Sequence, residues 1–143
     1  MVTKPSHAGA SSRDATNRPR PHFLICDDEP RICEMVSRAL ADVAECDVAL
    51  NGADALSLLN AHRYDLLLLD LKMPKLDGFA VLQTLREARR PLRVIVLTAH
   101  QELDVAHGAH RMYSLLGYIT KPYEIHELHV AIERAMAQAP QPV

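Results

Sequence analysis

The sequence predicts an α/β protein in which a five-stranded parallel sheet is covered by helices on both faces. From His22 onward, short apolar runs alternate with amphipathic stretches of helical periodicity. Two of the runs, 66–69 and 94–97, are apolar at every position rather than at every second one. Strands of this kind are buried on both faces, which indicates a parallel sheet between two layers of helices.

The elements follow one another as five strand–helix pairs. The predicted strands are 22–26, 45–50, 65–70, 93–98 and 117–120, and the predicted helices are 30–42, 52–62, 78–88, 102–115 and 123–138. Right-handed crossovers limit this (βα)5 pattern to a doubly wound sheet, for which five strands commonly take the order 2-1-3-4-5. The first and third strands are then neighbours at the switch point of the sheet.

Local signals support several helices. Pro30 suits the first turn of the first helix, because its missing N–H would be unpaired there. Asn51 suits the cap of the second helix, and Gly78 begins the third just after Asp77. Apolar stripes support the first helix (Ile32, Met35, Val36, Ala39, Leu40) and the last (Ile125, Leu128, Ile132, Ala135, Met136).

Composition divides the chain of 143 residues into a polar leader, one domain and a short tail. Residues 1–21 hold almost no large apolar side chain and are predicted to be disordered. The leader carries a net charge of +3 within a total of -2, yet its dispersed cations without aromatics form a weak nucleic-acid footprint. The predicted domain spans 22–138, and residues 139–143 resemble the start of a linker, so no output domain is expected.

Other features exclude several classes. No apolar run approaches the 18 or so residues of a membrane span, and the N-terminus lacks a signal-peptide core, so we expect a cytoplasmic protein without membrane contact. Cys26, Cys33 and Cys46 match no zinc or CxxC spacing and are expected to be reduced thiols.

Three carboxylates, a hydroxyl and an ammonium lie at the ends of four predicted strands. Asp27 and Asp28 follow the first strand, Asp70 ends the third, Thr98 ends the fourth and Lys121 follows the fifth. Open α/β sheets place their ligand sites at these strand ends, so Asp27, Asp28 and Asp70 are predicted to meet at the switch point.

This set of side chains suits Mg²⁺ and a phosphoryl group. Three crowded carboxylates repel one another and are tolerable around a hard divalent cation, and oxygen ligands favour Mg²⁺ over zinc. A carboxylate can also attack phosphorus to form an aspartyl phosphate. Asp70, at the tip of the central strand, is the predicted nucleophile, with Lys121 as cation and Thr98 as hydrogen-bond donor.

Over about residues 22–138 the chain resembles the response-regulator receiver domain of two-component signalling, which has the flavodoxin-like form of this fold. The matching segments are Asp27-Asp28-Glu29-Pro30, Asp70 to Gly78, Thr98-Ala99 and Tyr118 to Pro122, in the family's order and near its spacings.

The resemblance implies that a histidine kinase or histidine phosphotransfer protein phosphorylates Asp70. It also implies that Asp28 and Asp70 bind Mg²⁺ directly, that Asp27 helps through water and that Lys72 lends its backbone carbonyl. Lys121, followed by a cis bond to Pro122, would pair with the phosphoryl oxygens. Thr98 would then swing toward the phosphoryl group, and Tyr118 would turn inward behind it.

The resemblance further implies a single-domain response regulator that signals through phosphorylation-dependent protein contacts and is not an enzyme beyond self-phosphorylation and slow self-dephosphorylation. Its downstream partner is unknown, a homodimer through the fourth and fifth helices is possible, and direct DNA binding is not expected because no helix-turn-helix follows residue 138. The alternatives are a phosphate-independent receiver, a receiver fragment of a longer regulator, and a haloacid-dehalogenase-type phosphatase. The phosphatase family has an acid two residues after its nucleophile, where this chain has Lys72.

Three further features bear on the switch. Ser114-Leu115 replaces a Gly-Ala pair usual in the family, which predicts a shifted or irregular fourth helix. Lys72 and His100 occupy positions that tune the lifetime of the phosphoryl group in the family. Two histidine pairs, His107 with His110 and His126 with His129, form either a solvated helix surface or a metal- or pH-sensing patch.

Overall fold

The protein is described by a computed structural model that covers residues 2–3, 19–73, 75–99 and 102–143. Most of the leader predicted to be disordered lies outside these residues, as do Pro74 of the Asp70 motif and His100. No helix among the described residues is both long enough and apolar enough to cross a membrane.

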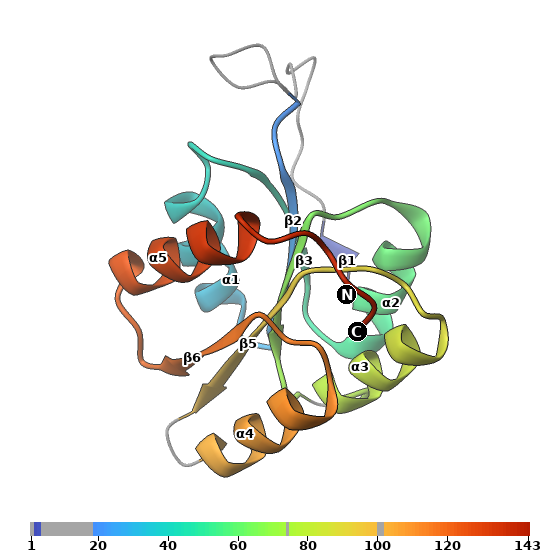
Figure 1. Cartoon of the computed structure of the whole chain (residues 1–143). Helices are drawn as coiled ribbons and strands as arrows, with labels where there is room; N and C mark the ends of the chain where they lie inside the picture. The colour runs from blue at the N-terminus through green and yellow to red at the C-terminus, as the bar shows by residue number, and fades with distance from the viewer. Residues whose placement is uncertain (1, 4–18, 74, 100–101) are drawn as a thin grey trace.

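Five parallel strands form the predicted sheet (Figure 1). They are β2 (His22–Cys26), β3 (Glu45–Ala49), β4 (Leu66–Asp70), β5 (Val94–Ala99) and β6 (Gly117–Lys121), and they lie in the order β3-β2-β4-β5-β6. This arrangement confirms the doubly wound topology with order 2-1-3-4-5. The start of the leader departs from the prediction: β1 (Val2–Thr3) pairs antiparallel with β3 at the edge of the sheet.

Helices cover both faces of the sheet. On one face lie α1 (Pro30–Ala39) and α5 (Ile125–Met136). On the other lie α2 (Gly52–Ala61), α3 (Gly78–Glu87) and α4 (Leu103–Met112). Each face has its own aliphatic core, and the two cores meet at β4, where Leu67 and Leu69 point to one and Leu66 and Leu68 to the other.

Two helices end about three residues before their predicted ends because buried contacts take over there. α1 stops at Ala39, and the fully buried Leu40 accepts a hydrogen bond from the Ala44 N–H that turns the chain into β3. After α4, Tyr113 is extended and buried, and its hydroxyl donates to Gln83 Oε1 at 3.0 Å. The predicted caps are present: Asn51 Oδ1 accepts from the Asp54 N–H, and Asp77 Oδ1 accepts from the Ala80 N–H.

The tail packs against the domain, which differs from the predicted linker-like stretch. The Leu92 N–H donates to the Gln141 carbonyl at 3.1 Å, and Arg93 Nε donates to the Gln138 carbonyl at 2.7 Å. Val143 is buried in the core on the α2–α3 face. Apolar burial and backbone pairing with the segment before β5 therefore order residues that look like a solvated linker.

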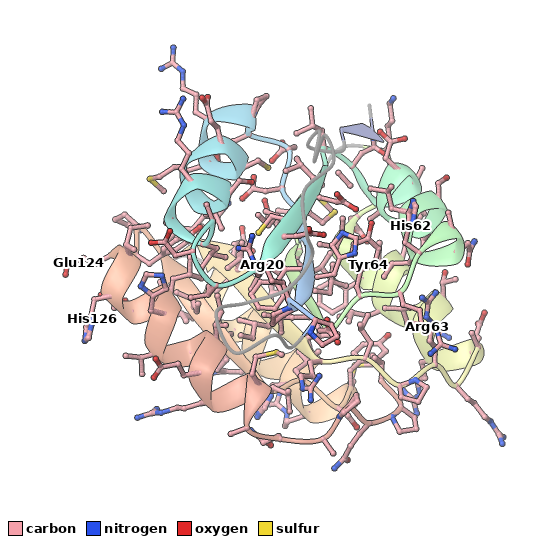
Figure 2. The ribbon with its side chains drawn as sticks, turned by 90° about the horizontal axis from the view of Figure 1, so that it is seen from above. Arg20, His62, Arg63, Tyr64, Glu124 and His126 are labelled. Carbon is pink, nitrogen blue, oxygen red and sulfur yellow. The ribbon has the colours of Figure 1, made fainter. Side chains whose placement is uncertain are left out.

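A buried polar cluster lies near the amino ends of the strands. Asp47 is completely buried, and its Oδ2 lies 2.9 Å from His22 Nε2 and accepts a 2.6 Å hydrogen bond from the Tyr64 hydroxyl. Figure 2 shows Tyr64 with His62 and Arg63 on the α2–α3 side, whereas Glu124 and His126 lie at the beginning of α5 on the other side. A buried carboxylate needs such partners, because leaving it unpaired is costly.

We expect Tyr64→Phe to lower the free energy of unfolding by about 1.5–3 kcal/mol, because it removes a hydrogen bond to a buried charged group. Tyr123→Phe is the matched control, since the buried Tyr123 hydroxyl has no hydrogen-bond partner among the described residues. Urea denaturation of both variants measures the difference. Equal stability losses in the two variants would mean that the Asp47 contact contributes nothing specific.

Candidate functional site

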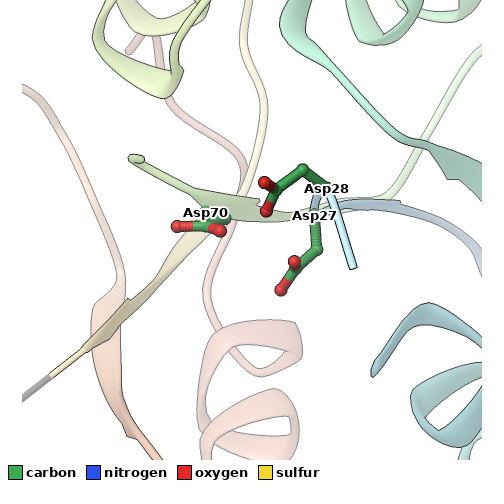
Figure 3. A group of neighbouring side chains, drawn as sticks. All are labelled: Asp27, Asp28 and Asp70. Atoms are coloured by element: carbon green, nitrogen blue, oxygen red, sulfur yellow. The ribbon is translucent and has the colours of Figure 1, made fainter. Parts of the chain in front are cut away.

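The carboxyl ends of the strands bring the three predicted acids together. Asp27 and Asp28 directly follow β2, and Asp70 is the last residue of the neighbouring strand β4. One carboxylate oxygen from each lies within 4.8 Å of the others (Figure 3). Asp27 and Asp70 are buried and Asp28 is exposed, so the group opens to solvent on the side of Asp28.

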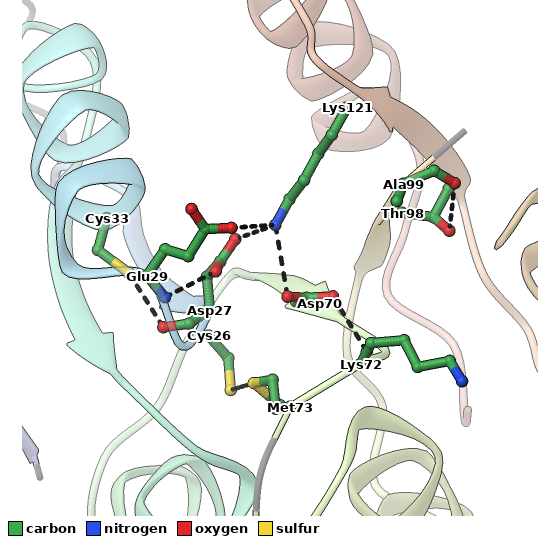
Figure 4. Close-up of polar contacts among 10 residues, drawn as sticks. All are labelled: Cys26, Asp27, Glu29, Cys33, Asp70, Lys72, Met73, Thr98, Ala99 and Lys121. Atoms are coloured by element: carbon green, nitrogen blue, oxygen red, sulfur yellow. Dashed lines mark hydrogen bonds and ion pairs between the residues drawn. The ribbon is translucent and has the colours of Figure 1, made fainter. Parts of the chain in front are cut away.

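Lys121 reaches this group from the end of β6. Its Nζ lies 2.6 Å from Asp27 Oδ2 and 3.4 Å from Asp70 Oδ2 (Figure 4). Backbone N–H groups hold the other oxygens: Glu29 donates to Asp27 Oδ1 and Lys72 to Asp70 Oδ1, both at 3.0 Å. The Lys121–Pro122 bond is cis, as the resemblance implies. The ammonium thus sits between two buried carboxylates.

Burial sets the protonation of the site. It raises the pKa of Asp70 from an ordinary 3.8 to about 6, although Lys121 and the Lys72 N–H favour the charged form. Burial lowers the pKa of Lys121, but its hydrogen bonds and attraction to Asp27 and Asp70 outweigh this, so the pKa lies above its ordinary value. Lys121 therefore stays charged at neutral pH, while Asp70 is held as a carboxylate at a cost.

The donor set fits a hard cation such as Mg²⁺. All three candidate ligands are carboxylates, and Mg²⁺ prefers oxygen ligands with several waters retained. The nearby Cys33 is not a ligand for a metal at this site, because only a thiolate binds metal and burial raises the pKa of this thiol to about 12. Its Sγ contacts the Asp27 carbonyl instead. The three cysteines are free and buried. The use of the Lys72 carbonyl as a ligand stays a prediction.

The Lys72 side chain points away from Asp70 (Figure 4). Its Nζ lies 3.8 Å from Glu102 Oε2, just before α4. Asp70 therefore has one close ammonium, that of Lys121, while the Lys72 ammonium lies beside Glu102 instead.

Gly78, predicted as the start of a helix and as the end of the matching segment that begins at Asp70, also has a packing role at this site. A Cβ on Gly78 would lie 2.5 Å from the Asp70 carbonyl oxygen and 2.6 Å from Leu71 Cα. The Gly78 N–H also donates to the Leu71 carbonyl at 3.1 Å. The first turn of α3 therefore packs directly on the backbone that carries Asp70.

The two predicted switch residues are bonded away from the acids. The buried Thr98 hydroxyl donates to the carbonyls of Ala99 at 3.3 Å and Glu102 at 3.4 Å. Tyr118 is 37% exposed, and its hydroxyl lies 2.6 Å from His107 Nε2. Tyr118 is thus turned outward in this structure, and its inward turn stays a prediction.

The histidine pairs do not form a metal cluster among the described residues. The rings of His107 and His110 lie 5.1 Å and 6.4 Å from the Tyr118 ring. His129 Nε2 lies 3.2 Å from the carbonyl of Ala39 at the end of α1, and His126 is exposed.

Known proteins share this fold and these sequence features. The sequence model of the response regulator receiver domain matches residues 23–133, so the chain belongs to the receiver domain family of two-component systems. It is 36% identical over 114 residues to the DNA-binding transcriptional regulator NtrC of Escherichia coli (strain K12), covering 79% of this chain and 24% of that protein. The chain therefore spans about a quarter of the length of this relative.

Solved structures agree with this assignment. A response regulator receiver domain protein from Clostridium thermocellum has a TM-score of 0.74 and 30% identity, over 82% of this chain and 94% of the other. The receiver domain of NtrX from Brucella abortus has a TM-score of 0.77 and 28% identity, over 82% and 99%.

The raised pKa of Asp70 predicts that Asp70→Asn stabilises the metal-free protein at neutral pH. In the wild-type protein, the contribution of the Asp70 side chain to stability is complete below about pH 4, where it is protonated in both the folded and the unfolded state. This contribution is lost as the pH rises through about 6, because the folded state disfavours the Asp70 carboxylate. We expect the free energy of unfolding of Asp70→Asn to exceed that of the wild-type protein by about 1–2 kcal/mol at pH 7.5, and this difference to become smaller as the pH falls to 5. Thermal unfolding in a chelator measures this gain. A constant difference between pH 5 and 7.5 would contradict the assigned cause.

Proposed function

We propose that this receiver domain accepts one phosphoryl group on Asp70 and signals by a phosphorylation-dependent change in its protein contacts. The observation that carries the proposal is the arrangement of Asp70 beside the Lys121 ammonium and two further carboxylates. A carboxylate with a neighbouring cation and a metal-binding acid group has the parts that phosphoryl transfer requires.

The proposed transfer comes from a phosphohistidine of a histidine kinase or a histidine phosphotransfer protein. An Asp70 carboxylate oxygen forms a bond to phosphorus as the phosphorus–nitrogen bond breaks, and the imidazole nitrogen keeps the electron pair. Lys121 stabilises the charge on the phosphoryl oxygens, and the Thr98 hydroxyl supplies a hydrogen bond once it leaves Ala99 and Glu102.

Mg²⁺ would be held by Asp28 and Asp70 directly, by Asp27 through water and by the Lys72 carbonyl. When bound, it neutralises negative charge on the transferring group. Asp27 would keep its contact with Lys121, which orients the ammonium toward Asp70. No turnover of a free substrate is proposed, because the chain has Lys72 where a phosphatase of the aspartyl-phosphate type has its second acid.

Signalling would follow from the added charge, about two negative charges at neutral pH. The phosphoryl group biases the domain only by the free energy that Thr98 and Lys121 gain in the switched arrangement. We propose that α4, β6 and α5 carry the change and present the partner surface, including a homodimer contact through α4 and α5.

A second candidate is the receiver part of a longer regulator. The observation in its favour is that the relatives include multidomain regulators such as NtrC, of which this chain matches 24%. The receiver chemistry proposed above would be the same. The output would then pass to another domain instead of to a separate protein.

Acetyl phosphate with Mg²⁺ tests the proposal. We expect the intact mass to rise by one phosphoryl group with Mg²⁺ and to stay unchanged in a chelator. Size-exclusion elution of the same samples reports whether phosphorylation also changes the oligomeric state. An adduct that forms equally well in the chelator would contradict the metal-dependent transfer.

A further inference from the structure

Helix α4 is held to the sheet by few apolar side chains. Its buried residues are Ala106 and Ala109, with Val105 partly buried against the same core, whereas α3 on the same face buries Val81, Leu82 and Leu85. Hydrophobic stabilisation scales with the apolar area removed from water, so alanines contribute little. A polar contact between α4 and the sheet therefore adds to what fixes this helix.

Tyr118 of β6 makes that contact. Its hydroxyl lies 2.6 Å from His107 Nε2, a short distance for such a hydrogen bond. The two rings also pack edge to face, with centroids 5.1 Å apart and an interplanar angle of 66°. His110, one turn further along α4, lies 6.4 Å from the Tyr118 ring, and no hydrogen bond between them is described.

The contact joins a second one at the start of the same helix. Thr98 on β5 donates to the carbonyl of Glu102, the residue that precedes α4. Both switch residues of the proposed function are thus bonded to α4 or to the residue before it. If Tyr118 turns inward, its hydroxyl must first leave His107.

We propose that His107 is a positioning residue that holds Tyr118 outward and so opposes switching until Asp70 is phosphorylated. The inference rests on the proposed function, because it assigns to Tyr118 a role in the response to phosphorylation. The His107 hydrogen bond exists only in the outward arrangement, so it lowers the population of the inward one. Removing the bond raises that population and lowers the activator concentration needed for switching.

The test compares His107→Leu with His107→Gln and His110→Leu in the full chain. Leucine removes the hydrogen bond and keeps helix propensity, glutamine retains a group that can bond to the phenol, and His110→Leu removes a ring neighbour that has no such bond. The probe is beryllium trifluoride with Mg²⁺, a stable mimic of a phosphoryl group on a carboxylate. The readout is the NMR signal of the ¹³C-labelled Tyr118 ring, assigned with Tyr118→Phe.

We expect His107→Leu to lower the half-maximal probe concentration about five-fold, the scale of one net hydrogen bond, and to shift the Tyr118 signal toward its switched position without probe. His107→Gln should restore most of the wild-type response, and His110→Leu should behave as wild type. The proposal would be overturned if His107→Leu had the same half-maximal probe concentration as the wild-type protein. It would also be overturned if the Tyr118 signal of His107→Gln shifted as far as that of His107→Leu.

Treatment of the same samples with acetyl phosphate distinguishes the phosphorylation of Asp70 from the role of His107. An adduct on the wild-type protein together with an unchanged titration of His107→Leu would overturn the role of His107 alone. The absence of an adduct and of any probe response in the wild-type protein would overturn the proposed function, and the role of His107 with it.

Discussion

Asp70→Asn is expected to abolish the phosphoryl adduct completely while the protein stays folded. The amide is nearly isosteric with the carboxylate, so the packing around residue 70 is kept, but it lacks the charged oxygen that attacks phosphorus. Its removal also relieves the charge repulsion among Asp27, Asp28 and Asp70. Intact mass after incubation with acetyl phosphate and Mg²⁺ measures the loss, and circular dichroism checks the fold.

Asp47→Asn is the matched control for this change. Asp47 is also a buried aspartate on the parallel sheet, but it belongs to the cluster with His22 and Tyr64 near the amino ends of the strands. We expect this variant to lose stability and still to form the adduct. An adduct that persists in Asp70→Asn, or disappears in a folded Asp47→Asn, would contradict the assignment of Asp70.

Gly78→Ala is expected to lower the stability of the protein and to slow phosphoryl transfer to Asp70. The new Cβ would lie 2.5 Å from the Asp70 carbonyl oxygen, and the atoms it meets are backbone, so either α3 or the Asp70 segment must move. Overpacking of this kind costs about 1–3 kcal/mol. We expect a lower free energy of unfolding in urea and slower adduct formation with acetyl phosphate.

Gly108→Ala provides a control of opposite sign. Gly108 lies inside α4, and a Cβ there would meet no atom within 4 Å beyond its chain neighbours and the nearby backbone of its own helix. Alanine should stabilise the helix by about 0.5–1 kcal/mol, because glycine loses more conformational freedom on folding. If Gly78→Ala left stability and adduct formation unchanged, close packing of α3 on the Asp70 backbone would not matter.

The parallel sheet and the acid group could be predicted from the sequence because local patterns determine them. The continuous apolar run 66–69 reports burial on both faces, and strands of a doubly wound sheet end at a common edge. Any polar residue directly after such a strand is therefore placed near the others. This topology places Asp27, Asp70 and Lys121 at the same edge of the sheet.

Contacts between remote segments could not be predicted in this way. The pairing of Val2 with Ala49 and the burial of Val143 depend on which surfaces the completed domain offers. The bond between His107 and Tyr118 depends on the rotation of α4 about its axis. Helical spacing pairs His107 with His110 but does not indicate which strand residue they face.

Chemical mapping tests most directly whether Asp70 itself carries the phosphoryl group. Borohydride reduces an aspartyl phosphate to homoserine, so peptide sequencing by mass spectrometry after treatment of the phosphorylated protein identifies the modified position. We expect homoserine at position 70 and unmodified Asp27 and Asp28. Homoserine at position 27 or 28, or a phosphoryl group on a histidine or hydroxyl side chain, would contradict the assignment of Asp70.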